Sequence, residues 1–338
     1  MSFRVGLTSD LDNGNGGFSW GDIAIETLSS LKWEFLKPTG KNFTPESVLG
    51  YHAIAFAGPG VDESSFGAPD ESPLVISRFG VGYDNIDLAA CTKAGVALTI
   101  TPDGSKKPVA TAALTLVLST LHKLHAKMNT AQSHQWDKRM NLGQGLNGKT
   151  VATIGLGNIG SEFFRLIAPF DCTRISFDPW KTQAEADSIN VTLMDLDSLL
   201  AIADVVVVLA TLTPETRHML NKQKLSLMKK NAVLINISRG PIIDEAALIE
   251  VLQNGSIAGA GIDVFETEPP SADNPLVKME NVIATPHNIG WTDELAFGMG
   301  KSAFTSITEI SHGRIPQYVV NKDVLETSQF KKKLAQFQ

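Results

Sequence analysis

The sequence predicts an α/β protein that has two doubly wound parallel sheets, each covered by helices. Short β-rich runs alternate with helical stretches along the 338 residues, which is typical of βαβ units. The run DVVVVLA (204–210) has no polar alternation, so we expect a parallel strand that is buried on both faces. The alternation forms two series separated by a long Ala- and Leu-rich stretch, and this chain length is typical of about two domains.

The first series consists of short runs that are bounded by Gly, Pro or Asp, as strands are. Its predicted strands are residues 4–9, 53–57, 74–79 and 96–100. The stretch 107–132 follows, with apolar residues at helical spacing, and we expect one long helix that has Pro108 in its first turn.

The second series alternates strands and helices more regularly. Its predicted strands are 150–155, 174–178, 204–210, 232–238, 257–264 and 281–286, and its helices are 158–168, 195–203 (capped by Asp195) and 244–255. A last helical stretch, 292–313, lies too far downstream for this sheet, so we expect the chain to cross back there to the first domain. The basic tail 331–338 is expected to fray.

Composition excludes several classes of partner. The formal net charge is −7, so neither nucleic acid nor an anionic membrane is an expected partner. The N-terminus resembles no signal peptide and no apolar run reaches 18 residues, so we expect a cytoplasmic protein. Cys91 and Cys172 lie far apart and match no metal-ligand spacing, so we predict two buried thiols and no metal site.

The hexamer GLGNIG (155–160) matches the dinucleotide-binding pattern G-x-G-x-x-G. It directly follows a predicted strand and opens a helix, which is the context that the pattern requires. Gly155 is expected to form the tight turn, Gly157 to let the backbone approach a pyrophosphate, and Gly160 to allow close helix packing. The amides of Asn158 and Ile159 are expected to face the anion.

The next predicted strand ends in Asp178, eighteen residues after Gly160. A carboxylate at this position accepts hydrogen bonds from the adenosine ribose and repels a 2′-phosphate, so NAD is favoured over NADP. Lys181 lies close by in sequence and would weaken this preference.

Three side chains that can do acid–base or anion chemistry follow strands of the second series. Arg239 follows VLINIS, Glu268 lies in DVFETEPP, and His287 follows VIATP. Ligands of open α/β sheets bind where strands end, so these residues are expected to meet. Each one alone is more often a surface charge or a structural residue, and it is their joint occurrence with the glycine motif that indicates a catalytic site.

Reduction of a 2-keto acid needs a proton donor at the carbonyl oxygen while hydride reaches the carbon. Histidine is suited to this role near neutral pH, and a carboxylate such as Glu268 would orient the ring and favour its charged form. Arg239 would bind a substrate carboxylate through two hydrogen bonds or polarise the ketone. In the oxidation direction His287 would act as the base.

These residues resemble the D-isomer-specific 2-hydroxyacid dehydrogenase family, which includes glyoxylate/hydroxypyruvate reductases and phosphoglycerate dehydrogenases. The resemblance extends roughly over residues 74–316, and its most specific segments are VATIGLGNIG, LTPETRHML (212–220), LINISRGPIIDEAAL (234–248), GIDVFETEP (261–269) and ATPH (284–287).

The resemblance implies that Arg239, Glu268 and His287 are the catalytic residues. It implies further residues at the cofactor, namely Ala210, Thr216, Ile237 and Asp263, and it implies that the Val81 and Gly82 amides hold the substrate carboxylate. It also implies an NAD-binding Rossmann domain (103–289) inserted into a flavodoxin-like substrate domain (1–102 and 290–338), a homodimer, and a D-2-hydroxy acid as substrate.

The sequence departs from the family pattern at several places, among them the linker DGSKKP (103–108). Thr111 stands where many members carry Glu, and FAGPG (56–60) lacks the basic residue that phosphoglycerate enzymes place nearby, which disfavours phosphoglycerate as substrate. Trp291 is expected either to form an apolar wall for the substrate or to belong to the core.

Two alternatives stay open at this point. A non-catalytic NAD(H)-sensing protein, as in corepressors of this scaffold, would keep the same glycines and could keep the same three side chains. Within the enzymes, the substrate would be either a small acid such as glyoxylate or a bulkier branched or aryl keto acid.

Overall fold

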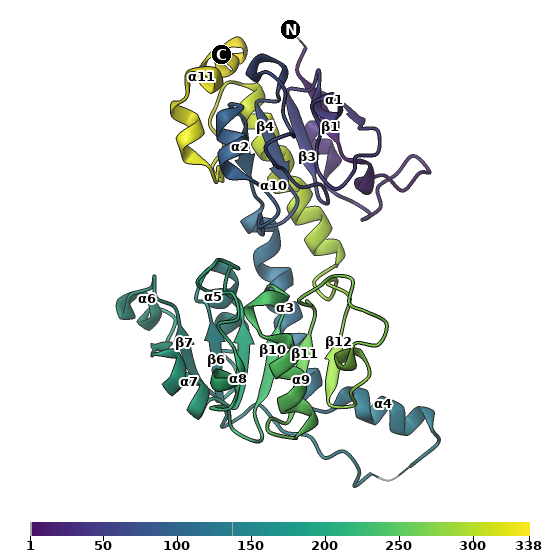
Figure 1. The fold of residues 1–338 in the computed structure, drawn as a ribbon, viewed down its shortest axis with the longest axis vertical. Coiled ribbons are helices and arrows are strands. Elements are labelled where there is room, and N and C mark those ends of the chain that lie inside the picture. Colours follow the sequence, from purple (N-terminus) through teal and green to yellow (C-terminus); the bar gives the residue numbers. More distant parts are fainter. Residues whose placement is uncertain (1, 137) are drawn as a thin grey trace. The chain divides into compact units, whose positions relative to one another are not determined.

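The computed structural model describes residues 2–136 and 138–338. The chain divides into two compact units, one formed by residues 1–105 and 291–338 and the other by residues 106–290. The second unit is therefore inserted into the first along the chain, as the order of the colours in Figure 1 shows.

The first unit has a five-stranded sheet in which every pair of neighbouring strands is parallel. Its strands are β1 (Arg4–Leu7), β2 (Lys32–Phe35), β3 (Ala53–Phe56), β4 (Val75–Arg78) and β5 (Ala97–Thr99). They lie in the order β2-β1-β3-β4-β5, which is the flavodoxin-like doubly wound order. The sequence did not predict β2, because three of its four residues are exposed and no buried run marks it.

Helices cover both faces of this sheet. The short helices α1 (Pro45–Val48) and α2 (Leu88–Lys93) pack on one face through a core that includes Ile54, Ile76 and Cys91. The long helix α10 (Asp293–Ser311) lies on the other face, where the Ser77 hydroxyl donates to the Ala303 carbonyl (3.2 Å). With α10, the chain returns to the first unit after the second series of strands and helices.

The basic tail does not fray, contrary to the expectation from sequence. Residues Ser328–Leu334 form α11, and Phe330 and Leu334 on this helix are buried. The ammonium of Lys333 is buried too, where it donates to the carbonyls of Pro73 (2.9 Å), Ala94 (3.3 Å) and Ser72 (3.4 Å). Three consecutive lysines predict side chains that are exposed to solvent. Only the tertiary packing shows that the third one, Lys333, points inward.

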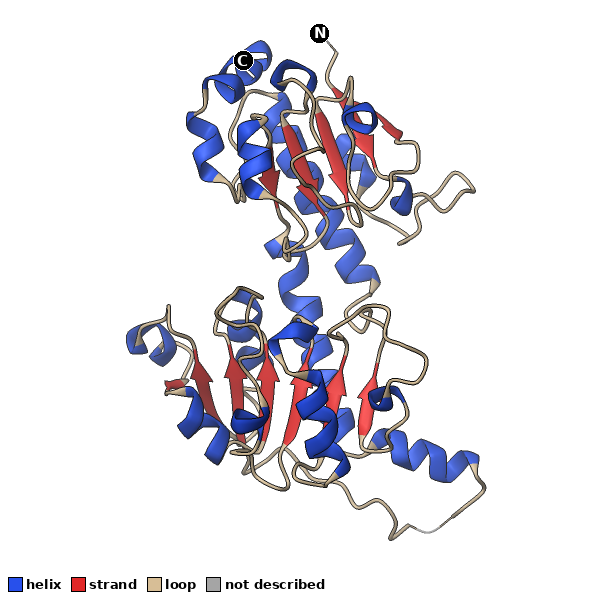
Figure 2. Cartoon of the chain, viewed as in Figure 1, coloured by secondary structure: helices blue, strands red, loops and turns tan. Residues whose placement is uncertain are grey.

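The second unit has a seven-stranded parallel sheet, shown edge to edge in Figure 2. Its strands are β6 (Thr150–Ile154), β7 (Thr173–Phe177), β8 (Thr192–Leu193), β9 (Val205–Val208), β10 (Val233–Asn236), β11 (Gly259–Ile262) and β12 (Val282–Ala284). Their order is β12-β11-β10-β9-β6-β7-β8. Numbered within the unit this is 3-2-1-4-5-6 with a seventh strand added, which is the Rossmann order.

Each face of this sheet is covered by its own layer of helices. Val206 and Val208 of β9 belong to the core under α7 (Leu196–Ile202), α8 (Lys222–Leu225) and α9 (Glu245–Gln253). Val205 and Val207 belong to the core under α3 (Pro102–Leu121) and α5 (Asn158–Leu166). All four valines are fully buried, which confirms the prediction made from the unbroken β-branched run.

The predicted single helix over 107–132 is wrong in two respects. The helix α3 begins at Pro102, so Pro102 is the first-turn proline and Pro108 lies inside the helix. It ends at Leu121, and α4 (Leu124–Gln132) follows after Lys123, whose φ of 52° is left-handed. The apolar spacing continues across the break, so periodicity alone could not locate it.

Of the two cysteines, Cys91 is buried as predicted, whereas Cys172 is only half-buried. Within residues 2–136 and 138–338, no helix combines the length and the hydropathy that crossing a membrane would require.

Candidate active site

The glycine loop connects β6 to α5 with the geometry that the motif predicts. Gly155 has a φ of 101°, and a Cβ there would lie 2.9 Å from the Ala210 amide nitrogen, so the turn excludes any side chain. At Gly157 a Cβ would meet nothing within 4 Å, so this backbone is open to a ligand. A Cβ on Gly160 would lie 2.5 Å from the Gly155 carbonyl oxygen.

The start of α5 presents backbone donors next to this open backbone. Gly157 is the N-cap, and Asn158 and Ile159 are the first two residues of the helix. Amides of a first helical turn have no acceptor within the helix, and the helix dipole favours an anion there. This arrangement fits the pyrophosphate of a dinucleotide.

Asp178 directly follows β7 and lies against the glycine loop. Its Oδ2 accepts from the Leu156 amide (2.7 Å) and its Oδ1 from the Trp180 amide (2.9 Å). These bonds fix the carboxylate beside the loop. The ammonium of Lys181 is paired with Glu185 (2.8 Å).

The other residues implied for the cofactor follow strands β9, β10 and β11. Ala210 lies beside Gly155, and the Thr216 hydroxyl donates to the Thr211 carbonyl (2.7 Å), which shapes the loop after β9. Ile237 is buried after β10. Asp263 is buried directly after β11.

Arg239 is placed by a turn that packs on a neighbouring loop. The Arg239 carbonyl accepts from the Asn236 side-chain amide (3.0 Å), and the Arg239 guanidinium donates to the Ser238 carbonyl (2.8 Å). A Cβ on Gly240 would lie 1.9 Å from the Phe265 carbonyl, so the absence of a side chain lets this turn contact the loop that carries Glu268. Arg239 and Glu268 are thus brought to adjacent loops.

His287 and Glu268 form a direct pair. The imidazole Nδ1 lies 2.8 Å from Glu268 Oε2, while Glu268 Oε1 accepts from the Phe265 amide (3.0 Å). Both carboxylate oxygens are therefore engaged, one with its own loop and one with the ring. His287 has a φ of 54°, a conformation that is rare outside glycine and that concentrates at functional sites.

The electrostatics keep Glu268 ionised. Burial is the largest influence and would raise the pKa of Glu268, but the hydrogen bonds from His287 and from the Phe265 amide, with the charges of His287 and Arg239, lower the pKa below its usual value. The charge of Arg239 lowers the pKa of this carboxyl because Arg239 and Glu268 lie on adjacent loops.

Asp263 holds the turn that carries His287, which sequence reasoning did not find. Its Oδ1 accepts from the Thr285 hydroxyl (2.7 Å) and from the amides of Asn288 (2.9 Å) and Ile289 (3.1 Å). Its carbonyl accepts from the His287 amide (2.7 Å). Burial raises the pKa of Asp263, and these hydrogen bonds with the charge of His287 oppose that rise.

A second histidine–carboxylate pair supports the loop that carries Glu268, and the sequence did not predict this pair either. His218 Nε2 lies 2.6 Å from Glu266 Oε1, and the Glu266 amide donates to Glu245 (2.8 Å). His218 lies in LTPETRHML (212–220), but nothing local in that segment indicates a partner 48 residues away. The pair ties the loop after β9 to the loop after β11.

Val81 and Gly82 lie in the first unit, in the loop after β4. Gly80 is anchored on both sides, because its amide donates to the Thr101 hydroxyl (2.8 Å) and its carbonyl accepts from the Thr101 amide (3.0 Å). Among the residues that the structure describes, no acceptor is found for the amides of Val81 and Gly82. These two donors are available to an anion.

Comparison with known proteins identifies one family that this chain resembles. The family model of the D-isomer specific 2-hydroxyacid dehydrogenase NAD binding domain matches residues 114–288. A glyoxylate reductase of Thermofilum pendens is 36% identical over 76% of this chain and 78% of its own length, and one of Korarchaeum cryptofilum is 31% identical over 87% and 90%. A D-3-phosphoglycerate dehydrogenase of Methanocaldococcus jannaschii is 38% identical over 74% of this chain but 48% of its own length. The chain thus spans about half the length of the phosphoglycerate dehydrogenases it matches.

Solved structures show the same fold. The TT0316 protein of Thermus thermophilus superposes with a TM-score of 0.80 at 27% identity, covering 94% of this chain and 100% of that one. A D-lactate dehydrogenase of Aquifex aeolicus, in complex with NAD and lactic acid, superposes with a TM-score of 0.77 at 25% identity, covering 91% and 96%. The predicted resemblance and fold class are confirmed, and the glycine loop, the start of α5 and Asp178 fit NAD. The chain belongs to the D-isomer specific 2-hydroxyacid dehydrogenase family, and it binds NAD through the domain that residues 114–288 match.

Proposed function

We propose that the protein is an NAD-dependent oxidoreductase that transfers a hydride between nicotinamide and C2 of a D-2-hydroxy acid or the matching 2-keto acid. The observation that carries this proposal is the 2.8 Å contact between His287 Nδ1 and Glu268 Oε2, with Arg239 on the adjacent loop. All three side chains follow the carboxyl ends of strands in a sheet whose first loop is built for a dinucleotide.

In the reduction direction, bound NADH supplies the hydride that reaches C2. Because Nδ1 is engaged with Glu268, Nε2 is the nitrogen from which His287 gives its proton to the carbonyl oxygen. The ionised Glu268 stabilises the imidazolium before transfer and fixes the ring orientation. His287 then takes a proton from solvent, and in the oxidation direction the neutral ring removes the hydroxyl proton.

Arg239 binds the carboxylate or polarises the carbonyl of the acid through its guanidinium. The amides of Val81 and Gly82 are proposed to hold the substrate carboxylate. Their support is that the anchored Gly80 precedes two donors without an acceptor in the described chain. Asp263 is proposed to lie at the nicotinamide carboxamide, and Ala210, Thr216 and Ile237 to line the cofactor site.

We also propose that NAD is preferred over NADP, because Asp178 presents a fixed carboxylate where the ribose hydroxyls would bind. The location is proposed to be cytoplasmic, as the sequence suggested.

The second unit is further proposed to pair with a second copy of the chain. The helix α4 and the segment after it expose large apolar side chains, with exposed fractions of 51% for Met128 and 84% for both Trp136 and Leu142. Exposed apolar groups gathered on one segment are typical of an interface. Light scattering coupled to size-exclusion chromatography should give twice the chain mass of 36.3 kDa.

The decisive experiment is an NADH absorbance assay over glyoxylate, pyruvate, hydroxypyruvate, 4-methyl-2-oxopentanoate and phenylpyruvate, repeated with NADPH. We expect turnover of at least one keto acid by the wild-type protein and none above background by His287→Gln. If no acid is turned over while NADH still binds, the proposal is wrong and the protein is an NAD(H)-sensing member of the family.

A further inference from the structure

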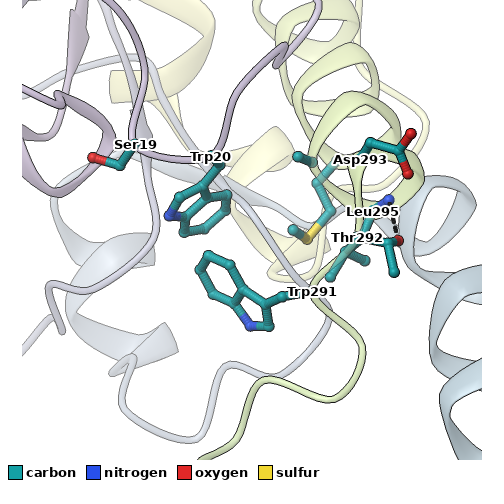
Figure 3. Close-up of a pocket in the computed structure, with 8 residues that line it drawn as sticks. Ser19, Trp20, Trp291, Thr292, Asp293 and Leu295 are labelled. Carbon is teal, nitrogen blue, oxygen red and sulfur yellow. Dashed lines mark hydrogen bonds between the residues drawn. The ribbon is translucent and has the colours of Figure 1, made fainter.

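The first unit contains a cavity of about 260 Å³ that has no role in the proposed mechanism. Two indole rings form one wall: Trp20, from the loop after β1, and Trp291, just before α10 (Figure 3). Leu295, Ala296 and Met299 of α10 form the floor and are buried. Trp291 is 47% exposed, so a large apolar surface borders the cavity.

The polar groups at the rim are engaged elsewhere. The Thr292 hydroxyl accepts from the Leu295 amide (3.2 Å), and the Asp293 carboxylate accepts from the Glu294 amide (2.9 Å). In Figure 3 the Asp293 carboxylate points away from the two rings. The third polar lining residue is Ser19, whose hydroxyl donates to the Asp12 carbonyl (2.8 Å). The indoles and α10 therefore supply the apolar part of a mixed lining. The cavity volume lies below the ~300–1,000 Å³ of pockets that hold whole ligands, so it suits a single side chain.

A line of aromatic rings connects this cavity to the loop of Val81 and Gly82. The Trp20 ring lies 4.1 Å from the Trp291 ring, edge to face, and 5.6 Å from the Phe79 ring. Phe79 directly precedes Gly80, so the loop proposed for the carboxylate begins where this aromatic stack ends. Trp291 also follows His287 by four residues, and a fully extended chain of that length spans at most about 14 Å.

We propose that the cavity between Trp20 and Trp291 takes the apolar substituent at C3 of the keto acid, and that the substrates are acids with a branched or aromatic side chain. This inference rests on the proposed function, because it needs a 2-keto acid held by the Val81–Gly82 loop. Glyoxylate carries only hydrogen beyond its carbonyl carbon and leaves the cavity empty. An apolar side chain covers both indoles and removes their surface from water.

The test is the ratio of kcat/KM for 4-methyl-2-oxopentanoate to kcat/KM for glyoxylate, measured with NADH. We expect a ratio of at least about ten in the wild-type protein, since one methylene in an apolar pocket is worth roughly 10–200-fold. The ratio should fall at least about tenfold in both Trp20→Ala and Trp291→Ala. A wild-type preference for glyoxylate, a smaller fall or a rise in the ratio would overturn the inference.

Trp33→Ala is the matched control, because Trp33 is a partly exposed tryptophan of the same unit that does not line the cavity. Its ratio should equal that of the wild type. Quenching of tryptophan fluorescence by 4-methyl-2-oxopentanoate gives a readout that does not depend on turnover. It should be lost when Trp20→Ala and Trp291→Ala are combined and kept in Trp33→Ala, and quenching of wild-type size in the double variant contradicts the inference. Absence of turnover with every acid is a failure of the proposed function, whereas turnover of glyoxylate alone refutes only the cavity assignment.

Discussion

The His287 amide donates to the Asp263 carbonyl at 2.7 Å, and the Asp263 carboxylate accepts from the two amides that follow His287. The left-handed backbone at His287 is thus held from both sides by one buried residue. Asp263 fixes the backbone of His287, and Glu268 fixes its imidazole ring. These two residues lie close together in the sequence.

Asp263 is therefore expected to act as a positioning residue. Asp263→Ala removes the acceptor of three hydrogen bonds and leaves buried donors unpaired, at roughly 1–3 kcal/mol each. We expect kcat to fall at least about a hundredfold, and Asp263→Asn, which keeps an acceptor oxygen, to restore part of it. The control is Asp204→Ala, which removes the buried carboxylate that accepts from the Thr150 amide (2.9 Å) at the amino ends of β6 and β9. That control should lower the melting temperature without a comparable loss of kcat; equal losses would leave Asp263 with a merely structural role.

His287→Gln should lower kcat by about 10²–10⁴-fold, because proton transfer is lost while the side-chain volume is nearly kept. Glu268→Gln should lower kcat less, since the ring keeps a hydrogen-bond partner but loses the charge that favours the imidazolium. Stopped-flow and steady-state kinetics with the best keto acid give both values. The affinity for NADH, titrated by fluorescence, should be unchanged in both variants, and an unchanged kcat in His287→Gln would remove this residue from the mechanism.

Asp178→Ala should relax the preference for NAD. The carboxylate that repels a 2′-phosphate is removed, so the ratio of kcat/KM for NADH to that for NADPH should fall at least about tenfold. Asp187→Ala, an exposed acidic residue in α6 (Gln183–Asp187), serves as a control for the change in net charge. A ratio that is insensitive to Asp178→Ala would show that another group selects the cofactor.

Gly240→Ala tests the contact between the Arg239 turn and the Glu268 loop. The added methyl would lie 1.9 Å from the Phe265 carbonyl, so one of the two loops must move. We expect a loss of about 2 kcal/mol or more in the free energy of unfolding, since overpacking typically costs 1–3 kcal/mol, together with a large fall in kcat. Gly145→Ala in the same unit meets nothing within 4 Å and should be neutral in both measurements.

The buried Lys333 predicts a rise of stability with pH. Burial lowers the pKa of Lys333 from 10.5 to about 8, although the charge of Asp70 opposes this shift. Between these values the unfolded chain binds a proton that the folded chain has released, so the free energy of unfolding increases with pH by up to ~1.4 kcal/mol per unit. The stability contributed by the neutral amine is lost as the pH falls through 8.

The window for this measurement is pH 7 to 9. Burial raises the pKa of Cys91 from 9.0 to about 12, which has the opposite effect and removes stability above pH 9. Urea unfolding of the wild type and of Lys333→Met at pH 7, 8 and 9 isolates the lysine, because the thiol is present in both. The difference in unfolding free energy should change by about 1 kcal/mol over this window, and a constant difference would refute the assignment.

Much of the site could be predicted from the sequence because its signals are local. These signals are the glycine loop, the carboxylate after the next strand and the three side chains at strand ends. Each signal lies within a few consecutive residues, which the covalent chain holds close in space. Tertiary contacts are not encoded in this way. Nothing near Asp263 in sequence indicates that its carboxylate holds residues 285–289, and nothing near Gly240 indicates Phe265.

The sequence by itself determined the two doubly wound sheets, the dinucleotide loop and the identity of the candidate catalytic residues, because hydrophobic periodicity and turn-forming residues act over short distances. Only the tertiary structure decided that β2, most of whose residues are exposed, forms an edge of the first sheet. It likewise decided that a continuous helical pattern breaks at Lys123 and that the side chain of Lys333 points inward. It also decided which buried groups fix His287 and Glu268. These features depend on the packing of strands and helices that are distant in sequence, and a local pattern carries no information about such partners.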